Sequence, residues 1–481
     1  MLFNSYVFIL MFLPLTVLGY FFLNKFKLYT YSTFFLCGMT LWFYGFYNPK
    51  HLVIILFSIL VNYIFSRIIN KKEEKKKHLF LGILINIGLL FYFKYYNFFI
   101  ENINVLFQRN YEIQQIAIPL GISYFTFQQI AYLVDSYRGE TAEYSFMEYV
   151  SFVLFFPQIS SGPIVRHKDL IPQFQDKNKK KVSYENLLMG IYIFSCGLVK
   201  KVLIADTFGK AAGWGFSNIE LMSSMDAILV SLCYTFQLYF DFSGYSDMAI
   251  GIGRMLNIEL PQNFNSPYKA TSIVDFWDRW HMSLTRFFRE YVYFPLGGSR
   301  KGTMRTYLNI MIVFLLSGIW HGANWTFVIW GLLNGVLNCI TRMLKDVWKK
   351  VPKMIQWVST FFTVNFLWII FRAKNFAEAK SFICKIFEMK NFSISSELKE
   401  CLILEEIGVI GKFVPQNIFA HISTLNLVMF FAAAFVIIIY GKNSSEVKFE
   451  KTMKRMILIT FFLCWSIISL SGVSEFLYVD F

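Results

Sequence analysis

One histidine of this chain lies where few polar side chains are tolerated. Between Leu308 and Arg342 runs an apolar stretch longer than the roughly 20 residues that one helix needs to cross a bilayer. Its middle holds the polar segment Ser317-Gly-Ile-Trp-His-Gly-Ala-Asn-Trp325. Ionisable groups at that depth are costly and are by default candidates for function. Because imidazole suits proton transfer near neutral pH, His321 is the candidate base of a membrane-embedded catalyst.

The neighbours of His321 indicate a narrow site. Gly318 and Gly322 allow backbones to approach closely, and Trp320 and Trp325 are expected to wall a slot beside the imidazole. A histidine that only bridges two helices by hydrogen bonds stays an alternative.

A second histidine precedes this motif. From Asp275 to Tyr293, aromatic side chains such as Trp280 recur at helical spacing, and Asp278 and His281 share a polar stripe. The pattern predicts one amphipathic helix at the membrane interface, with Asp278 one turn from His281 and able to orient it. A structural or substrate-positioning role is favoured for His281 over direct proton transfer. The remaining histidines are expected at the interface: His51, His78, His167 and His421.

Two carboxylates also lie in or beside an apolar run. Asp241 and Asp247 are open to three readings: acid/base work, cation or proton transport, and buried ion pairs. Ion pairs are favoured, and their expected partners are Arg254, Arg279 or Arg286.

Composition places these residues in a membrane protein. Of the 481 residues, 56% are hydrophobic and only 16% are charged, and the mean hydropathy is +0.47. We expect one integral membrane domain over residues 1–481. The net charge of +15 comes from short basic loops between apolar runs, which argues against nucleic-acid binding. The seven cysteines include no Cys-x-x-Cys pair, so no metal site is expected.

The apolar runs predict an all-α polytopic membrane protein with roughly ten to twelve transmembrane helices. The N-terminal run is read as a first span and not as a cleaved signal. The basic cluster Lys71–Lys77 is placed in the cytoplasm, and Lys94, near the far end of the fourth run, is expected to snorkel to the interface. The expected spans are 5–23, 29–47, 51–69, 79–99, 186–204, 226–252, 307–320, 324–342, 355–372, 424–440 and 456–472.

Two segments mix apolar side chains with helix breakers. They are Pro119–Gln128 and Phe156–Pro163, which contain Gln128 and Gln158. Irregular backbone at membrane depth survives only where protein or a watery cavity satisfies its polar groups. Re-entrant segments are therefore expected here.

Together these motifs resemble the membrane-bound O-acyltransferases. The segment from Asp275 to Gly298, paired with Leu316-Ser-Gly-Ile-Trp-His-Gly322, is similar to the bacterial branch typified by the alginate O-acetyltransferase membrane subunit. The segments at Pro119–Gln128, Phe155–Pro163 and Asp241–Asp247 also resemble that branch. The resemblance implies a ring of tilted helices around a thin centre with a tunnel, and a histidine-motif core at about 117–342.

The resemblance also assigns residues. By position, His321 corresponds to the catalytic histidine, and His281 corresponds to a second motif residue, usually Asn or His, that lines the reaction chamber. Asn324 or a nearby backbone N–H is a candidate to stabilise the oxyanion. The expected substrate-binding and tunnel residues are Trp277, Trp280, Asp278, Trp320, Asn324, Trp325, Ser317, Gln128, Gln158 and Asp241.

The chemistry implied is acyl transfer from a cytoplasmic thioester without a bound cofactor. Acetyl-CoA is the expected donor, with a carrier-protein thioester as the alternative, and the basic loop 166–181 is expected to attract its phosphates. The favoured function is O-acetylation of an exported, alginate-like polysaccharide by a multi-pass protein of the plasma membrane. Its expected partners are an extracytoplasmic acetyltransferase or acceptor protein and membrane lipids. D-alanyl transfer to teichoic acid, peptidoglycan O-acetylation and, remotely, a non-enzymatic transporter stay open.

Overall fold

The computed structural model describes residues 1–71, 74–141, 144–404, 415–444, 446, 452–470 and 476–477. Within these ranges the regular secondary structure is helical throughout. The prediction of an all-α polytopic protein is confirmed. Residues 72 and 73 of the basic Lys71–Lys77 cluster lie outside the described residues.

The first third of the chain forms helices that are joined by short turns, except for the long connection between α5 and α6. Two of these helices contain a π-helical turn; the label η marks π-helical turns and, for η4 and η5 below, 3₁₀ turns. The elements are η1 (Val7–Phe12), α1 (Leu13–Lys25), α2 (Tyr29–Gly45), α3 (Lys50–Lys71), α4 (Lys75–Leu90), η2 (Phe91–Tyr95), α5 (Tyr96–Phe107) and α6 (Ile122–Tyr137).

The middle of the chain consists of shorter helices and one very long helix, α12. The elements are α7 (Phe146–Val153), α8 (Phe156–Ile159), α9 (His167–Gln175), α10 (Tyr184–Val199), η3 (Lys200–Ala205), α11 (Asp206–Ser217), η4 (Ile219–Leu221), α12 (Ser224–Met255), η5 (Pro267–Lys269), α13 (Ile273–Arg279), α14 (Met282–Phe288) and η6 (Arg289–Tyr293).

The last part of the chain carries the His321 motif and several peripheral helices. The elements are α15 (Thr303–His321), α16 (Trp325–Met343), α17 (Lys345–Trp348), α18 (Lys353–Arg372), α19 (Phe376–Phe387), α20 (Ser396–Cys401), α22 (Gln416–Tyr440) and α23 (Met453–Ile468).

Seven of the described helical stretches are long and apolar enough to cross a membrane. The first is Val7–Lys25, as predicted for the N-terminal run. Four further predicted spans are also helices, α2, α12, α16 and α23, but they are shorter or less apolar than these seven. The long helix α12 is rich in small and polar side chains because protein, and not lipid, surrounds most of it.

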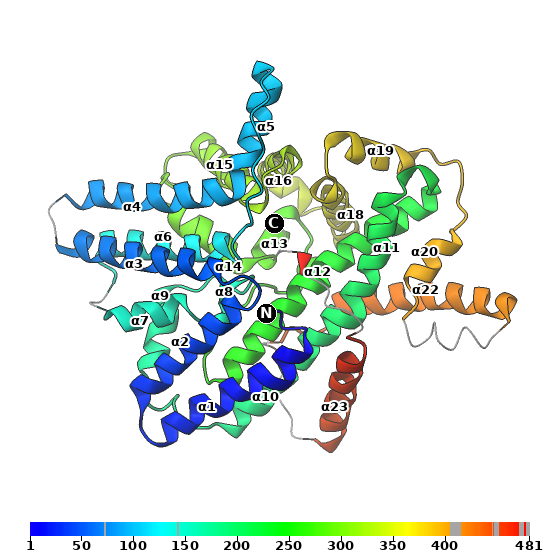
Figure 1. Cartoon of the computed structure of the whole chain (residues 1–481). Helices are drawn as coiled ribbons and strands as arrows, with labels where there is room; N and C mark the ends of the chain where they lie inside the picture. The colour runs from blue at the N-terminus through cyan, green and yellow to red at the C-terminus, as the bar shows by residue number, and fades with distance from the viewer. Residues whose placement is uncertain are drawn as a thin grey trace.

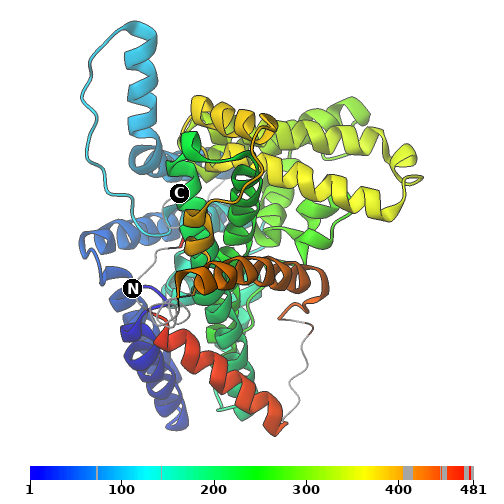
Figure 2. The same ribbon diagram turned by 90° about the vertical axis from the view of Figure 1, so that its right-hand side faces the viewer.

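Helix α12 runs through the centre of the molecule (Figure 1). On one side α3, α4 and α6 lie side by side, and on the other α11 and α18 pack against α12. Helix α5 projects from the rest of the molecule in both views (Figures 1 and 2). The buried apolar side chains form two large clusters, and α12 contributes to both of them. It is therefore the element that joins the N-terminal helices to the histidine motifs.

Glycines set the distance between α12 and α10. A Cβ on Gly197 would lie 2.5 Å from the carbonyl oxygen of Gly244, and one on Gly251 would lie 2.7 Å from that of Gly190. These separations are too short for a methyl group. The two backbones are in direct contact, as is common where small residues line helix pairs in membranes.

Candidate active site

His321 is the last residue of α15, at the turn of a helical hairpin. Gly322 is extended, and Asn324 begins α16 as its N-cap. The two helices approach closely because Gly318 and Gly331 have no side chain. A methyl group on Gly318 would overlap the Phe327 carbonyl oxygen, and one on Gly331 would overlap the α15 backbone in the same way. Gly318 thus allows α15 and α16 to pack closely, and His321 is placed at the end of α15.

Aromatic rings enclose the imidazole of His321, whose residue is only 2% exposed. Its ring centroid lies 5.0 Å from both Trp320 and Trp330 and 5.5 Å from Phe371. Trp320 is where the sequence predicted it. Trp325 is not: it is 51% exposed, and its indole N–H donates to Asn102 at 2.8 Å. The second ring beside the imidazole is Trp330 of α16. The sequence did not predict it, because it lies more than one helical turn beyond the His321 motif.

One hydrogen bond fixes the proton on the ring. Nδ1 of His321 lies 2.6 Å from the carbonyl oxygen of Ser317. A carbonyl oxygen can only accept, so Nδ1 carries the hydrogen of the neutral ring. Nε2 is therefore the nitrogen with a lone pair, and it is the atom able to act as a base.

Asn324 is engaged in the hairpin turn. Its side-chain oxygen accepts from the Thr326 backbone N–H at 3.0 Å, and its amide donates to the Lys374 carbonyl at 2.7 Å. The first of these bonds satisfies a backbone N–H of the first turn of α16, which has no partner within the helix. An oxyanion role for Asn324 stays a prediction, and it requires the amide to leave these bonds.

The segment around His281 differs from its prediction. The single helix expected over 275–293 is wrong, because the chain is extended at Trp280 and left-handed at His281 (φ 45°), between α13 and α14. The physical reason is hydrogen bonding to Asn263, which lies in the segment between α12 and α13. The N–H of Met282 donates to the Asn263 carbonyl at 2.9 Å, and the Ser283 hydroxyl donates to the Asn263 side chain at 2.6 Å.

This break decides what surrounds His281. The residue is buried, and its ring lies 4.7 Å from Phe242 and 5.9 Å from Trp320. Asp278 is exposed and no longer one helical turn away, so the predicted orienting pair is not formed by helical spacing. Trp320 lies next to both histidines and brings the two sequence motifs into one site.

The remaining predicted tryptophans have different surroundings. Trp277 donates its indole N–H to Asn334 at 3.1 Å and lines a cavity. Trp280 is fully buried and lies 5.1 Å from the Trp368 ring, inside the aromatic core. Trp277 thus lines a cavity, whereas Trp280 packs within the aromatic core.

Two cavities reach the neighbours of His321. A cavity of about 270 Å³ reaches Ser317, and its wall includes Trp277, Asp278, Arg289 and Arg342. A second cavity of about 770 Å³ is almost wholly apolar and reaches Trp320, Gly322 and Trp325. The linings of these two cavities include neighbours of His321 on α15 and at the hairpin turn.

Gln128 and Gln158 support irregular backbone. Gln158 donates to the Phe152 carbonyl at 2.6 Å, and Gln128 donates to the Val165 carbonyl at 3.4 Å. Both side chains are buried, so these bonds satisfy main-chain oxygens that water does not reach. Their predicted place in a tunnel stays a prediction.

Asp241 and Asp247 form buried ion pairs, as favoured, but with other partners. Lys201 lies 2.7 Å from Asp241, and Lys200 lies 2.6 Å from Asp247. The expected arginine partners are wrong. The signal was present in the sequence, since Lys200 and Lys201 interrupt an apolar run that two carboxylates could neutralise.

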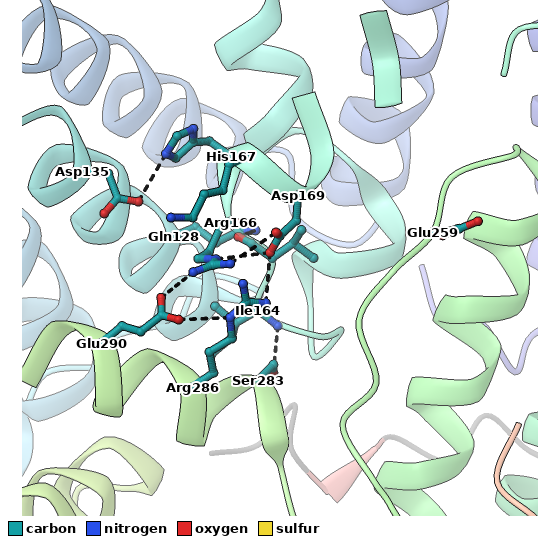
Figure 3. Close-up of polar contacts among 12 residues, drawn as sticks. Gln128, Asp135, Ile164, Arg166, His167, Asp169, Glu259, Ser283, Arg286 and Glu290 are labelled. Carbon is teal, nitrogen blue, oxygen red and sulfur yellow. Dashed lines mark hydrogen bonds and ion pairs between the residues drawn. The ribbon is translucent and has the colours of Figure 1, made fainter. Parts of the chain in front are cut away.

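The arginines pair elsewhere, and one cluster holds the His281 segment in place (Figure 3). Arg166 lies 2.6 Å from Glu290 and 3.2 Å from Asp169, and Arg286 lies 3.1 Å from Asp169 and 3.3 Å from Glu290. The N–H of Ile164 also donates to the Ser283 hydroxyl at 3.0 Å. The loop before α9 is therefore fastened to α14, directly after His281.

His167 extends this junction. The interface position predicted for it is wrong, because it is buried and its Nε2 lies 3.2 Å from Asp135. The hydroxyl of Tyr291 donates to the same Asp135 carboxylate at 2.8 Å.

We expect Glu290→Gln to lower the melting temperature of the purified protein. The change removes one charge from a half-buried cluster and leaves two guanidinium groups short of a carboxylate, a loss of roughly 1–3 kcal/mol. The matched control is Glu259→Gln, since Glu259 forms a single ion pair among the described residues, with Arg254 on the surface. Thermal melting in detergent measures both. Equal melting temperatures for the two variants would contradict a structural role for the cluster.

Comparison with known proteins agrees with this geometry. The membrane-bound O-acyltransferase family matches residues 36–377, which include both histidine motifs. The chain belongs to this family, and it is a multi-pass membrane enzyme that transfers acyl groups. The transporter alternative loses its support.

Individual relatives are similar over long stretches. A peptidoglycan O-acetyltransferase of Helicobacter pylori is 39% identical over 522 aligned residues, covering 100% of this chain and 98% of the relative. A probable alginate O-acetylase of Azotobacter vinelandii is 37% identical over 405 residues, covering 82% of this chain and 80% of the relative. A teichoic acid D-alanyltransferase of Bacillus subtilis is 31% identical over 274 residues, covering 53% of this chain and 69% of the relative.

Proposed function

We propose that this enzyme transfers an acetyl group from a cytoplasmic thioester to a hydroxyl of peptidoglycan. The transfer passes through an extracytoplasmic acceptor protein at the outer face of the plasma membrane. The observation that carries the proposal is the similarity to a peptidoglycan O-acetyltransferase over the whole of both chains. An exported alginate-like polysaccharide is the second candidate acceptor, supported by the shorter match to the alginate O-acetylase.

The proposed chemistry centres on Nε2 of His321. This atom takes the proton of the acceptor hydroxyl while the hydroxyl oxygen attacks the thioester carbonyl. The C–O bond forms, the C–S bond breaks, and the leaving thiolate takes the proton back from the imidazolium. The Ser317 carbonyl supports each step because it holds the ring in the required tautomer.

The donor is proposed to arrive through the cavity that reaches Ser317. Arg289 and Arg342 line its wall, and Asn338 lies beside Arg342 at 2.8 Å. Guanidinium groups bind phosphates well, and acetyl-CoA and carrier-protein thioesters both bear phosphate. The basic residues that follow α16 argue for a cytoplasmic mouth at Arg342. The second, apolar cavity suits lipid chains.

Arg342→Gln and Arg289→Gln are expected to raise the KM for acetyl-CoA by about tenfold each, with kcat nearly unchanged, because they remove binding that ground and transition states share. The control is Arg305→Gln, since Arg305 is an exposed arginine of α15 outside the lining of this cavity. Initial rates of thiol release by the full-length protein in proteoliposomes measure the effect. An unchanged KM in both variants would contradict this donor route.

The acceptor is tested directly. Proteoliposomes that contain the full-length protein receive acetyl-CoA and either peptidoglycan fragments or an alginate-type polymer with the cell's own extracytoplasmic transferase. Mass spectrometry then identifies the acyl group and the acylated molecule. Acetylated peptidoglycan supports the proposal, an acetylated polymer alone supports the second candidate, and thiol release without acetylation of either acceptor would overturn both.

A further inference from the structure

Lys94 is buried beside the end of the His321 helix. It lies in η2, the π-helical turn between α4 and α5, and it is 8% exposed. The predicted snorkelling of this side chain to the interface is wrong. A buried lysine in a membrane protein is costly, so its contacts need a physical explanation.

The ammonium group binds the C-terminal carbonyls of α15. Nζ donates to the Trp320 carbonyl at 2.6 Å and to the His321 carbonyl at 3.3 Å, with Ser123 Oγ also at 3.3 Å. The neighbouring Tyr95 hydroxyl donates to the Ile319 carbonyl at 2.8 Å. Three successive carbonyls therefore receive donors from one short turn.

These carbonyls are the ones that a helix cannot satisfy by itself. The last four C=O groups of any α-helix have no partner within it, and the negative end of the helix dipole attracts a cation there. Gly322 leaves the helix at once in an extended conformation. Lys94 and Tyr95 thus supply the donors that the end of α15 lacks.

The same ammonium group also faces the indole that separates the two histidines. Nζ of Lys94 lies 5.7 Å from the Trp320 ring, within the range of a cation–π contact. Trp320 in turn contacts His281 and His321 and borders the apolar cavity. One side chain therefore holds both the main chain at His321 and the ring beside it.

We propose that Lys94 is a positioning residue, which fixes the end of α15 so that Nε2 of His321 meets the acceptor hydroxyl. The inference rests on the proposed function of His321. Lys94 contacts main-chain oxygens and not the reacting atoms, so it acts through the histidine. Tyr95 is its auxiliary, since it binds the preceding carbonyl of the same helix. A displacement of about 1 Å at a reacting group is enough to cost roughly 100-fold in rate.

The test compares Lys94→Met, Lys94→Arg and Tyr95→Phe in the full-length protein, by thiol release from acetyl-CoA in proteoliposomes. Lys94→Met is expected to lower kcat about 10- to 100-fold with a KM within about twofold of the parent, because positioning is lost and donor binding is kept. Lys94→Arg restores part of the rate, since arginine keeps the charge and the donors. Tyr95→Phe lowers kcat by a few-fold.

The control is Lys77→Met, because Lys77 is an exposed lysine at the start of α4 that forms a surface ion pair with Glu74. Rates are divided by the folded fraction from gel filtration and thermal melting. A normal kcat in Lys94→Met, or a loss that the folded fraction explains, overturns the proposal. If that variant does not fold, a normal kcat in Tyr95→Phe does so. Activity in His321→Ala instead overturns the proposed function.

Discussion

Replacing His321 with alanine is expected to abolish acyl transfer while the protein stays folded and inserted. General base catalysis contributes about 10²- to 10⁴-fold, so the residual rate falls to the background of thioester hydrolysis. His321→Gln is the sharper variant. Glutamine fills a similar volume and retains an N–H that can donate to the Ser317 carbonyl, but it is not a base at neutral pH.

The measurement is acetyl transfer and thiol release by purified protein in proteoliposomes, with thermal melting of each variant. The control is His78→Ala, because His78 lies at the start of α4, where its ring hydrogen-bonds to the carbonyl of Glu74. That variant is expected to keep the parent rate. Transfer at the parent rate by either His321 variant would remove the histidine from the mechanism.

His281 carries the second large effect, and here backbone and side chain are separable. Its left-handed conformation suits asparagine but not a β-branched residue. We expect His281→Asn to fold normally and to keep a measurable part of the activity. His281→Val is expected to lose stability by roughly 1–3 kcal/mol from strain alone, and to lose activity with it.

His281→Ala separates positioning from strain. It removes the ring beside Trp320, and we expect kcat to fall about 10- to 100-fold from the disturbed geometry of the site. Lys27→Val is the matched control for strain, because Lys27 is also left-handed (φ 61°) but lies in the exposed turn after α1. If His281→Val and Lys27→Val lose activity to the same extent, His281 has no role beyond its backbone.

The chemistry of the site follows in large part from local sequence. Gly318 and His321 already indicate a close helix pair that ends in a base, because glycine permits contact and imidazole titrates near neutrality. The buried carboxylates Asp241 and Asp247 indicate ion pairs for a similar reason: charge at membrane depth must be neutralised. Their partners Lys200 and Lys201 follow the same rule, because these lysines also lie in an apolar run.

Other features of the site lie beyond any local pattern. The periodicity of residues 275–293 is helical, yet the helix is interrupted at His281. There Asn263 hydrogen-bonds to the backbone N–H of Met282 and to the Ser283 hydroxyl. Trp330 of α16 and Phe371 of α18 replace Trp325 around His321 because the packing of helices, and not proximity in the chain, selects the rings that face it.

The sequence by itself determined that the protein is helical, that it spans a membrane and that it keeps a histidine among apolar residues. Apolar runs, helical periodicity and the cost of buried charge all act over a few turns. Only the tertiary structure decided what holds that histidine. Lys94 meets the end of α15 across a separation of 226 residues, and no pattern within one helix specifies such a contact.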